Sequence, residues 1–362
     1  MTAGLAGVVS TLLFFMHASR RMPLLEGINV WTVCGMPLLI WVLALGVRAY
    51  FYGGALDEHR FLDDEAQTAQ DAWQSWANRY LAVHASCVLL PDQVTGKALI
   101  EDSGDFPSRK GEARRIAGLP TQECSVGAAL EQVSQTLGPV LKAIPVEREL
   151  HVTLLTDVSA DHYDALRAIW EQSWTDALRR TAPTAVNVMA ELSLGWIDQT
   201  LKSASAAFEL IVVLQVRGGG AYSEGVAALL MSPDSLANVG ALPIVGGLSR
   251  PMPLDIVDLE KELAQFFGTQ TSAIKAMGLL ADSVEWEGTP GKVIAQGRLQ
   301  GSALEAKQQW IYESLCGQPG PLGHWLLTAL ALEMVRHQQH PLLVLAKDQS
   351  HWISTITTGE WA

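Results

Sequence analysis

Two side chains in this sequence have the type and the neighbours of a nucleophile, Ser223 and Cys316. Ser223 is the centre of the segment AYSEG at 221–225, a relaxed form of the G-x-S-x-G turn that presents a serine at a helix N-terminus beside an oxyanion hole. Cys316 directly precedes a glycine-rich segment, and a helix starting there would favour the thiolate. His324 lies downstream of both as a candidate base. One hypothesis is therefore acyl transfer or ester hydrolysis by Ser223 or Cys316.

A structural role for these side chains is the preferred interpretation. The G-x-S-x-G turn, or nucleophile elbow, needs a helix after the serine. The VAALLM run at 226–231 is as typical of a strand as of a helix. Cys87 and Cys124 are interpreted as buried small apolar residues. The cysteines are far apart and form no CxxC pair, so the sequence predicts no disulfide framework and favours a reducing compartment.

Two further sequence patterns could indicate a metal or cofactor site. Glu333, His337 and His340 fall at i, i+4 and i+7, a spacing that can bind a divalent metal on one helix face, but a solvated helix end explains them as well. Gly218–Gly220 lacks the Lys-Ser/Thr pair of a phosphate-binding loop and is interpreted as a turn. We therefore predict no bound metal and no cofactor.

The elements that must position these residues centre on Phe208–Pro233, where two apolar runs flank the triple glycine. Such a pattern predicts two buried strands joined by a glycine turn. Helical and strand patterns alternate along the chain, which indicates an α/β fold with a largely parallel sheet. The expected strands are Tyr80–Leu90, Leu150–Thr156, Ala185–Met189, Phe208–Val216, Val226–Met231, Lys292–Leu299, Pro341–Ala346 and Trp352–Thr357.

The expected helices complete this pattern. They are Val126–Ala143, Ala160–Thr181, Leu192–Ala204, Asp255–Met277 and Pro321–Gln338, while Asp92–Gly118 is expected to be a long loop. The order helix, strand, short turn, strand occurs near 193–231 and again near 322–357. This recurrence predicts two related halves, the second much reduced.

Composition and charge exclude one class of partner. The chain has 362 residues, 49% hydrophobic and only 17% charged, and a net charge of −13. Phosphate binding needs a basic face, and the sequence has no basic stripe, so nucleic acid is not expected as a partner.

The N-terminal residues have the composition of a membrane anchor. Ile28–Val47 is free of charged residues over about 20 positions, the length that spans a bilayer core, and aromatic residues follow at 50–52. The apolar stretch within Met1–Ala18 is a candidate for a shorter first span. The arginines are balanced on the two sides of the span, so charge does not set the orientation.

Two short segments resemble the thiolase and ketoacyl-synthase family. Ser223–Leu230 reads SEGVAALL, similar to that family's SEGAAALLL strand, and Gly317–Leu332 reads GQPGPLGHWLLTALAL, similar to its glycine-rich helix start. The resemblance implies a layered α/β fold of two halves over roughly Tyr80–Gly359. The predicted organisation is a membrane anchor at 1–54, a connecting helix at 55–79, a first half at 80–253, and a connector helix with a reduced second half at 254–362.

The same resemblance implies that catalysis is absent. The family places a cysteine nucleophile at the start of a buried helix, and the corresponding helix here, starting near Glu191–Gly195, has none. Its catalytic histidine follows a glycine, whereas here Pro321 follows Gly320 and His324 is displaced by three residues. A pseudoenzyme is therefore expected.

The chain resembles the adaptor family of bacterial type VI secretion in three respects: a membrane anchor, a thiolase-like domain that lacks the catalytic residues, and an acidic surface. That resemblance implies a non-catalytic protein that hands a lipase effector to a spike protein. It implies attachment to the bacterial inner membrane, and the free cysteines favour a cytoplasmic soluble part. Pro243–Pro253 and the loop Asp92–Gly118 are the expected binding surfaces.

Overall fold

The computed structural model describes residues 2–19, 27, 29–120, 125–145, 147–179, 182–183, 185–203, 205–237, 242–286 and 288–359. Cys124 and Ile28, the first residue of the expected membrane span, lie outside the described residues. The chain divides into two compact units, Met1–Ala72 and Trp73–Ala362.

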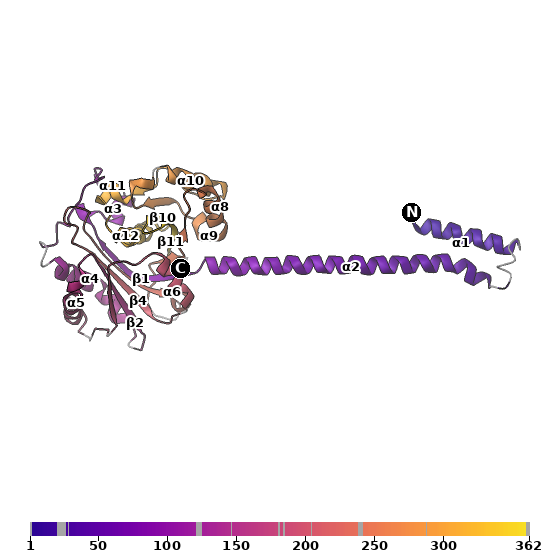
Figure 1. The fold of residues 1–362 in the computed structure, drawn as a ribbon, viewed down its shortest axis with the longest axis horizontal. Helices are drawn as coiled ribbons and strands as arrows, with labels where there is room; N and C mark the ends of the chain where they lie inside the picture. Colours follow the sequence, from indigo (N-terminus) through magenta and orange to yellow (C-terminus); the bar gives the residue numbers. More distant parts are fainter. Residues whose placement is uncertain are drawn as a thin grey trace. The chain divides into compact units, whose positions relative to one another are not determined.

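The N-terminal unit is helical. It contains α1 (Thr2–Ala18) and most of α2 (Val30–Ala77), which accommodates Pro37. Within the described residues, α2 is the one helix long and apolar enough to cross a membrane by length and composition. It continues without a break through the expected boundary at residue 54 and ends at Ala77, so the segments expected as a membrane anchor and as a connecting helix are one element (Figure 1).

The first half of the C-terminal unit is a sheet of order β3-β2-β4-β5-β1. Its strands β2, β3 and β4 are parallel, whereas β5 is antiparallel to β4 and to β1. The strands are β1 (Tyr80–Leu89), β2 (Leu150–Thr156), β3 (Val186–Met189), β4 (Phe208–Gln215) and β5 (Gly225–Pro233).

The second half repeats this topology with the order β9-β8-β10-β11-β6. Strands β8, β9 and β10 are parallel, and β11 is antiparallel to β10 and β6, while the short β7 pairs with β11. Antiparallel pairing of β1 with β6 joins the halves. The strands are β6 (Gly246–Ser249), β7 (Met252–Pro253), β8 (Gly278–Ala281), β9 (Gln309–Ile311), β10 (Leu342–Lys347) and β11 (His351–Thr358).

This strand order corrects two details of the expected organisation. β6 takes the place in the second half that β1 has in the first, so that half begins before residue 254. Each strand of the first half also has a counterpart in the second, which is therefore shorter in chain length but not reduced in strands. The sequence pattern missed β6, β8 and β9 because strands of three or four residues are too short to show alternation.

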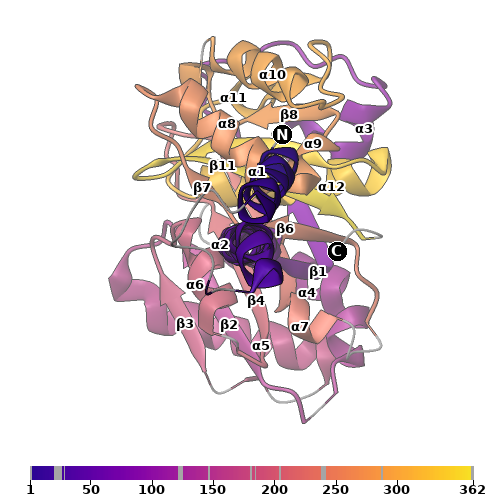
Figure 2. The same cartoon turned by 90° about the vertical axis from the view of Figure 1, so that its right-hand side faces the viewer.

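Helices cover the outer faces and fill the space between the halves (Figures 1 and 2). Leu210, Val212 and Leu214 of β4 pack with the outer helices of the first half, while Ile211 and Val213 pack with the central helices, as the two-residue period of a strand requires. The outer helices are α4 (Ser125–Ala143) and α5 (Tyr163–Leu178) on the first half and α8 (Leu259–Thr269) and α10 (Thr289–Leu299) on the second; the central ones are α6 (Gly195–Ser203) and α12 (Gly323–Gln338).

Three local expectations are wrong. The helix expected at Asp255–Met277 is divided into α8 and α9 (Thr271–Ile274) by extended backbone at Gln270. Lys292–Leu299 belongs to helix α10, not to a strand, and it buries Val293, Ile294 and Gly297 on one helical face. The expected loop Asp92–Gly118 contains a helical turn, α3, packed on α12. The remaining short helices are η2 (Pro91–Gln93), α3 (Gly96–Ile100), η3 (Ala160–His162), α7 (Asp234–Ala237), α9 (Thr271–Ile274), η4 (Val284–Trp286) and α11 (Tyr312–Cys316).

Candidate binding pocket

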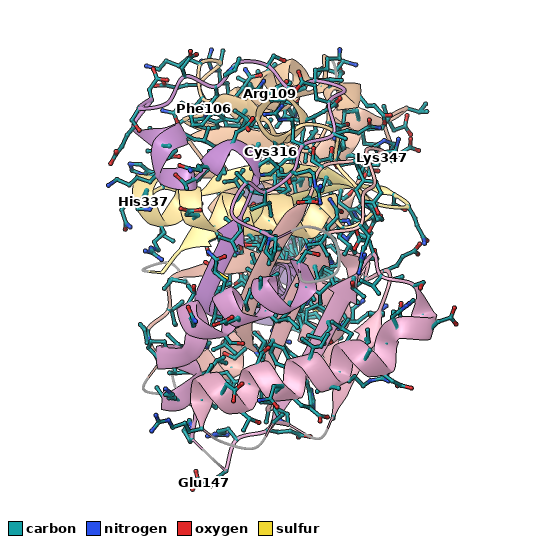
Figure 3. The ribbon with its side chains drawn as sticks, turned by 90° about the vertical axis from the view of Figure 1, so that its left-hand side faces the viewer. Phe106, Arg109, Glu147, Cys316, His337 and Lys347 are labelled. Carbon is teal, nitrogen blue, oxygen red and sulfur yellow. The ribbon has the colours of Figure 1, made fainter. Side chains whose placement is uncertain are left out.

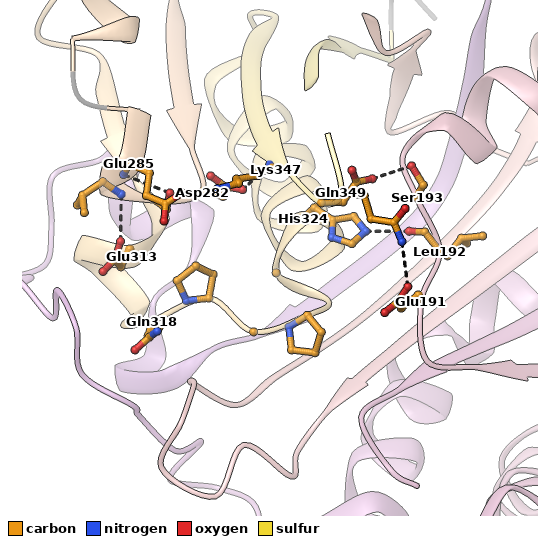
Figure 4. A pocket seen from close by; sticks show the side chains of 17 residues that line it. Glu191, Leu192, Ser193, Asp282, Glu285, Glu313, Gln318, His324, Lys347 and Gln349 are labelled. Atoms are coloured by element: carbon orange, nitrogen blue, oxygen red, sulfur yellow. Dashed lines mark hydrogen bonds and ion pairs between the residues drawn. The ribbon is translucent and has the colours of Figure 1, made fainter. Parts of the chain in front are cut away.

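The C-terminal unit has a pocket of about 520 Å³ where the carboxyl ends of parallel strands meet the start of α12 (Figure 4). Asp282 follows β8 and Asp348 follows β10, and these two strands run side by side. The carboxyl ends of parallel strands lie at one edge of a sheet, which is the usual place for a site in such folds. The carboxylates that line the pocket are Glu191, Asp282, Glu285, Glu313 and Asp348.

Asp282 is a buried carboxylate held on both oxygens. Its Oδ1 accepts a hydrogen bond from Trp286 Nε1 at 2.7 Å, and its Oδ2 accepts one from the Lys347 backbone N–H at 2.5 Å. Burial is the dominant influence, and it raises the pKa of this carboxyl to about 6 despite these donors. The site therefore contains a carboxyl group whose pKa lies near 6.

Asp348 fixes the opposite wall through four donors. Its Oδ2 accepts from Ser193 Oγ at 2.6 Å and from the Leu194 N–H at 3.2 Å, and its Oδ1 accepts from the Ser350 N–H and from Trp352 Nε1, both at 2.8 Å. These bonds connect the loop after β10 to the start of α6. Asp348 therefore holds the two halves together at the pocket.

Two further carboxylates differ in how firmly they are held. Glu313 is buried and accepts hydrogen bonds from the backbone N–H groups of Gly111 at 3.2 Å and Val284 at 3.0 Å. Glu285 is exposed and pairs with Lys347 Nζ at 2.6 Å. The ammonium lowers the pKa of the Glu285 carboxyl. The pocket thus has rigid carboxylates inside and one paired carboxylate at its rim.

His324 lies in the first turn of α12 and is only 3% exposed. Its Nε2 lies 2.8 Å from the Leu192 carbonyl oxygen, which also accepts from Trp325 Nε1 at 2.7 Å. A carbonyl only accepts, so the His324 proton is on Nε2. Its Nδ1 then carries a lone pair, and no partner for it occurs among the described residues. Burial lowers the pKa of His324, which keeps the ring neutral.

The structure places Ser223 in a backbone network, not in a catalytic dyad. Ser223 is 1% exposed; its hydroxyl accepts from the Arg114 N–H at 3.0 Å and donates to the Glu112 carbonyl at 3.3 Å. Within the described chain, no histidine nitrogen is bonded to it. Strand β5 follows directly, so the elbow's required helix is absent there. Ser223 therefore fastens the loop before α4 to the β4–β5 turn.

Cys316 ends α11 instead of beginning a helix, and its side chain is buried in the apolar cluster that includes α12. Burial raises the pKa of its thiol, which opposes the thiolate. Cys87, expected to be buried, is only partly buried against the outer apolar cluster of the first half, and burial raises the pKa of its thiol to about 12. Ser223 Oγ lies close to Gly317, the residue after Cys316, but within the described residues neither Ser223 nor Cys316 is hydrogen-bonded to His324, the base that the sequence suggested for either of them.

The other two patterns are also structural. Helix α12 ends at Gln338 and Gln339 adopts a left-handed conformation, so His340 leaves the face that carries Glu333 and His337. In the described part of the chain, no three metal-ligating side chains gather. Gly219 and Gly220 have positive φ angles, as the predicted turn requires.

Comparison with known proteins finds no matching family model and no matching curated protein. Among solved structures, the chain is similar to an oxazolomycin ketosynthase domain from Streptomyces albus (TM-score 0.49, 10% identity, 78% of this chain and 97% of that chain). It is also similar to the module 1 ketosynthase of bacillaene synthase from Bacillus amyloliquefaciens (0.49, 12%, 78% and 76%). A third is 3-oxoacyl-[acyl-carrier-protein] synthase III from Aquifex aeolicus (0.42, 11%, 76% and 99%).

The chain has a mixed α/β fold, and the strand pairing above defines its architecture. Similarity at this level does not extend to activity, substrate or partner.

The sequence interpretation missed most of the pocket. Asp282 and Asp348 come directly after the apolar runs GLLA and LLVLAK, which is a recognisable signal for residues at the carboxyl ends of strands. Glu313 carries no such signal, because its strand has only three residues. His324 was identified as a candidate, but its environment is set by Leu192, 132 positions earlier in the chain.

Proposed function

We propose that this chain is a membrane-anchored, non-catalytic protein that binds another protein, as an adaptor for a secreted effector. The observation that supports it most is the position of the two candidate nucleophiles. Ser223 is bonded to backbone groups and Cys316 lies among apolar side chains, and neither has a histidine partner within the described residues. Nucleophilic catalysis needs an activated hydroxyl or thiol within reach of a base.

The apolar part of α2 supports attachment to a membrane. The resemblance to type VI secretion adaptors extends this proposal to a lipase effector and a spike protein as partners, at the bacterial inner membrane with a cytoplasmic soluble part. A reporter active only in the periplasm, fused to the C-terminus, tests that orientation. Activity of this reporter would contradict the cytoplasmic assignment.

The loop at 101–120 is the surface that best fits a protein partner. It is largely exposed, yet it is anchored, because the Arg109 N–H donates to the Ser314 carbonyl and Arg109 and Arg114 both pair with Asp92. Figure 3 shows Phe106 and Arg109 on this loop. The other expected surface, Pro243–Pro253, is unsuitable because it contains the buried strand β6 and the buried Arg250.

Affinity purification from detergent-solubilised membranes tests the proposal. We expect the tagged full chain to recover a lipase-like toxin, and the loop variant Asp105→Lys/Lys110→Glu to recover at least about tenfold less. The variant Glu131→Lys/Lys142→Glu, with the same charge changes on α4, is the matched control and should behave as the wild type.

Other results would contradict the adaptor. Recovery of membrane-complex subunits alone would indicate a structural component. Hydrolysis of an acyl thioester or ester by the purified chain, abolished by Ser223→Ala or Cys316→Ala, would indicate an enzyme.

A further inference from the structure

The pocket at the start of α12 carries an excess of negative charge. Among the described residues, five carboxylates line it, and Lys347, which also lines it, is paired with Glu285. Both oxygens of Asp348 already accept two hydrogen bonds each. Each oxygen of Asp282 and Glu313 accepts one of the bonds described above, and because a carboxylate oxygen has two lone pairs it can accept a second. These carboxylates are therefore preorganised acceptors, and the concave shape strengthens their combined field.

His324 adds an independent sign of a ligand. Its ring is 97% buried at the pocket wall, and its Nδ1 has no donor among the described residues (Figure 4). Buried polar atoms in proteins are nearly always hydrogen-bonded. Since Nε2 carries the proton, the missing partner of Nδ1 must be a donor. His324 Nδ1 and the carboxylates would thus both bind a hydrogen-bond donor.

The start of α12 does not offer the alternative, an anion site. Pro319 and Pro321 have no backbone N–H. The Leu322 N–H is donated to Gln215 Oε1 at 2.9 Å, and the Gly323 N–H is donated to the Gly320 carbonyl at 2.9 Å. Backbone N–H groups usually bind anions at a helix N-terminus. At these four positions the N–H group is either missing or already donated within the chain.

We propose that this pocket binds a cationic nitrogen group, an ammonium or a guanidinium, between its carboxylates and His324 Nδ1. A volume of about 520 Å³ accommodates one long basic side chain or a small amine. The group can come from a Lys or Arg of a protein partner or from a free polyamine. The proposal does not depend on the adaptor role, because a small amine can occupy the pocket without any protein partner.

Calorimetric titration of the full chain in detergent tests this, with acetyl-arginine-methylamide, acetyl-citrulline-methylamide and spermidine as probes. Citrulline has nearly the shape of arginine without its charge. We expect binding of the arginine probe or of spermidine and none of citrulline. Tighter binding of arginine indicates a protein side chain as the natural source, and tighter binding of spermidine indicates a free polyamine.

Two variants at exposed positions should change the affinity for the cationic probes in opposite directions. Glu191→Gln removes a carboxylate and should weaken binding about fivefold, whereas Lys347→Gln removes the competing cation and should strengthen it by a similar factor. Glu171→Gln and Lys142→Gln make the same changes outside the pocket and should stay within about twofold of the wild type.

The outcomes against the proposal are equally specific. Absence of binding by both cations at millimolar concentration would overturn it. Equal binding of citrulline and arginine, or equal effects of the pocket and control variants, would also overturn it. His324→Gln, checked for folding by circular dichroism, should reduce affinity without changing the preference for charge.

Discussion

Asp282 illustrates how burial changes the chemistry of a single residue. It is 4% exposed and accepts hydrogen bonds from Trp286 and from the Lys347 backbone, yet the cost of removing the charge from water exceeds the gain from these donors. The consequence is a carboxyl with a pKa of about 6 in the folded chain, above the ordinary value of 3.8.

This raised pKa predicts a pH dependence of stability. The folded state binds a proton that the unfolded state has released between about pH 4 and pH 6, so this group lowers the free energy of unfolding as pH rises through that window. The change is about 3 kcal/mol at most. Chemical unfolding of the full chain in detergent at several pH values should show that wild type loses stability relative to Asp282→Asn as pH rises.

The control for this experiment is Asp161→Asn, which removes one exposed carboxylate. A constant difference between wild type and Asp282→Asn from pH 4 to pH 7 would refute the assignment.

Cys316 gives a second prediction at this scale. Because its thiol is fully buried and burial raises its pKa, iodoacetamide at pH 8 should leave it unmodified in the folded chain and alkylate it after unfolding. Peptide mass spectrometry locates the modification. Rapid alkylation of Cys316 in the native chain would instead favour the enzyme hypothesis.

At the scale of elements, the β4–β5 turn is fastened by a relay of hydrogen bonds centred on Gln215. Its Nε2 donates to the Ser223 carbonyl at 2.7 Å, and its Oε1 accepts from the Leu322 N–H at 2.9 Å. Gln318 extends the relay, since its carbonyl accepts from the Ser223 N–H and its N–H donates to the Glu112 carbonyl. The Gln215 side chain thus joins the β4–β5 turn to the start of α12.

Gln215→Leu should therefore destabilise the chain by about 1–3 kcal/mol, because it leaves two buried backbone groups unpaired. Urea unfolding measures this loss. Gln199→Leu, at an exposed position of α6, should change stability by less than about 0.5 kcal/mol. An equal effect of the two substitutions would show that the relay contributes nothing.

The residues at the end of α2 and directly after it belong to the C-terminal unit, which begins at Trp73, and they make several contacts within that unit. The guanidinium of Arg250 lies 3.8 Å from the ring centroid of Trp76 and pairs with Asp198, while Arg79 pairs with Asp234 at 2.9 Å. Asn78 accepts from the backbone and the hydroxyl of Thr271. Trp76, Asn78 and Arg79 are thus held within the unit that carries the pocket.

At the scale of the whole molecule, α2 combines a span-length apolar segment with a long polar extension. The apolar side chains of the segment, including Leu39 and Leu43, are exposed. A row of exposed apolar side chains of this length needs a nonpolar environment.

Leu39→Arg/Leu43→Arg should therefore release the chain from membranes, because each arginine at the centre of a span costs about 2.5–3.5 kcal/mol. Fractionation with carbonate extraction measures the change. Gln67→Arg/Gln70→Arg places the same charges on the polar part of α2 and should leave the chain in the membrane fraction. Membrane retention of the double leucine variant would show that α2 is not the anchor.

Much of the fold follows from local pattern. Long periodic segments such as α4, β2, β4 and α12 were predicted within a few residues of their observed ends, because apolar periodicity is strong over such lengths. The segment at 292–299 was assigned wrongly because its apolar residues suit a short strand as well as a helix. The pocket was missed because its members come from strand ends far apart in sequence.

By itself, the sequence determined the apolar N-terminal segment, the alternation of helices and strands and the paired strands around Gly218–Gly220, since these depend on residue type and spacing alone. Only the tertiary structure decided what Ser223, Cys316 and His324 do. Their roles depend on which groups approach them, and burial sets their protonation. Ser223 became a backbone anchor and Cys316 a core side chain, while His324 became a buried acceptor at the wall of an acidic pocket.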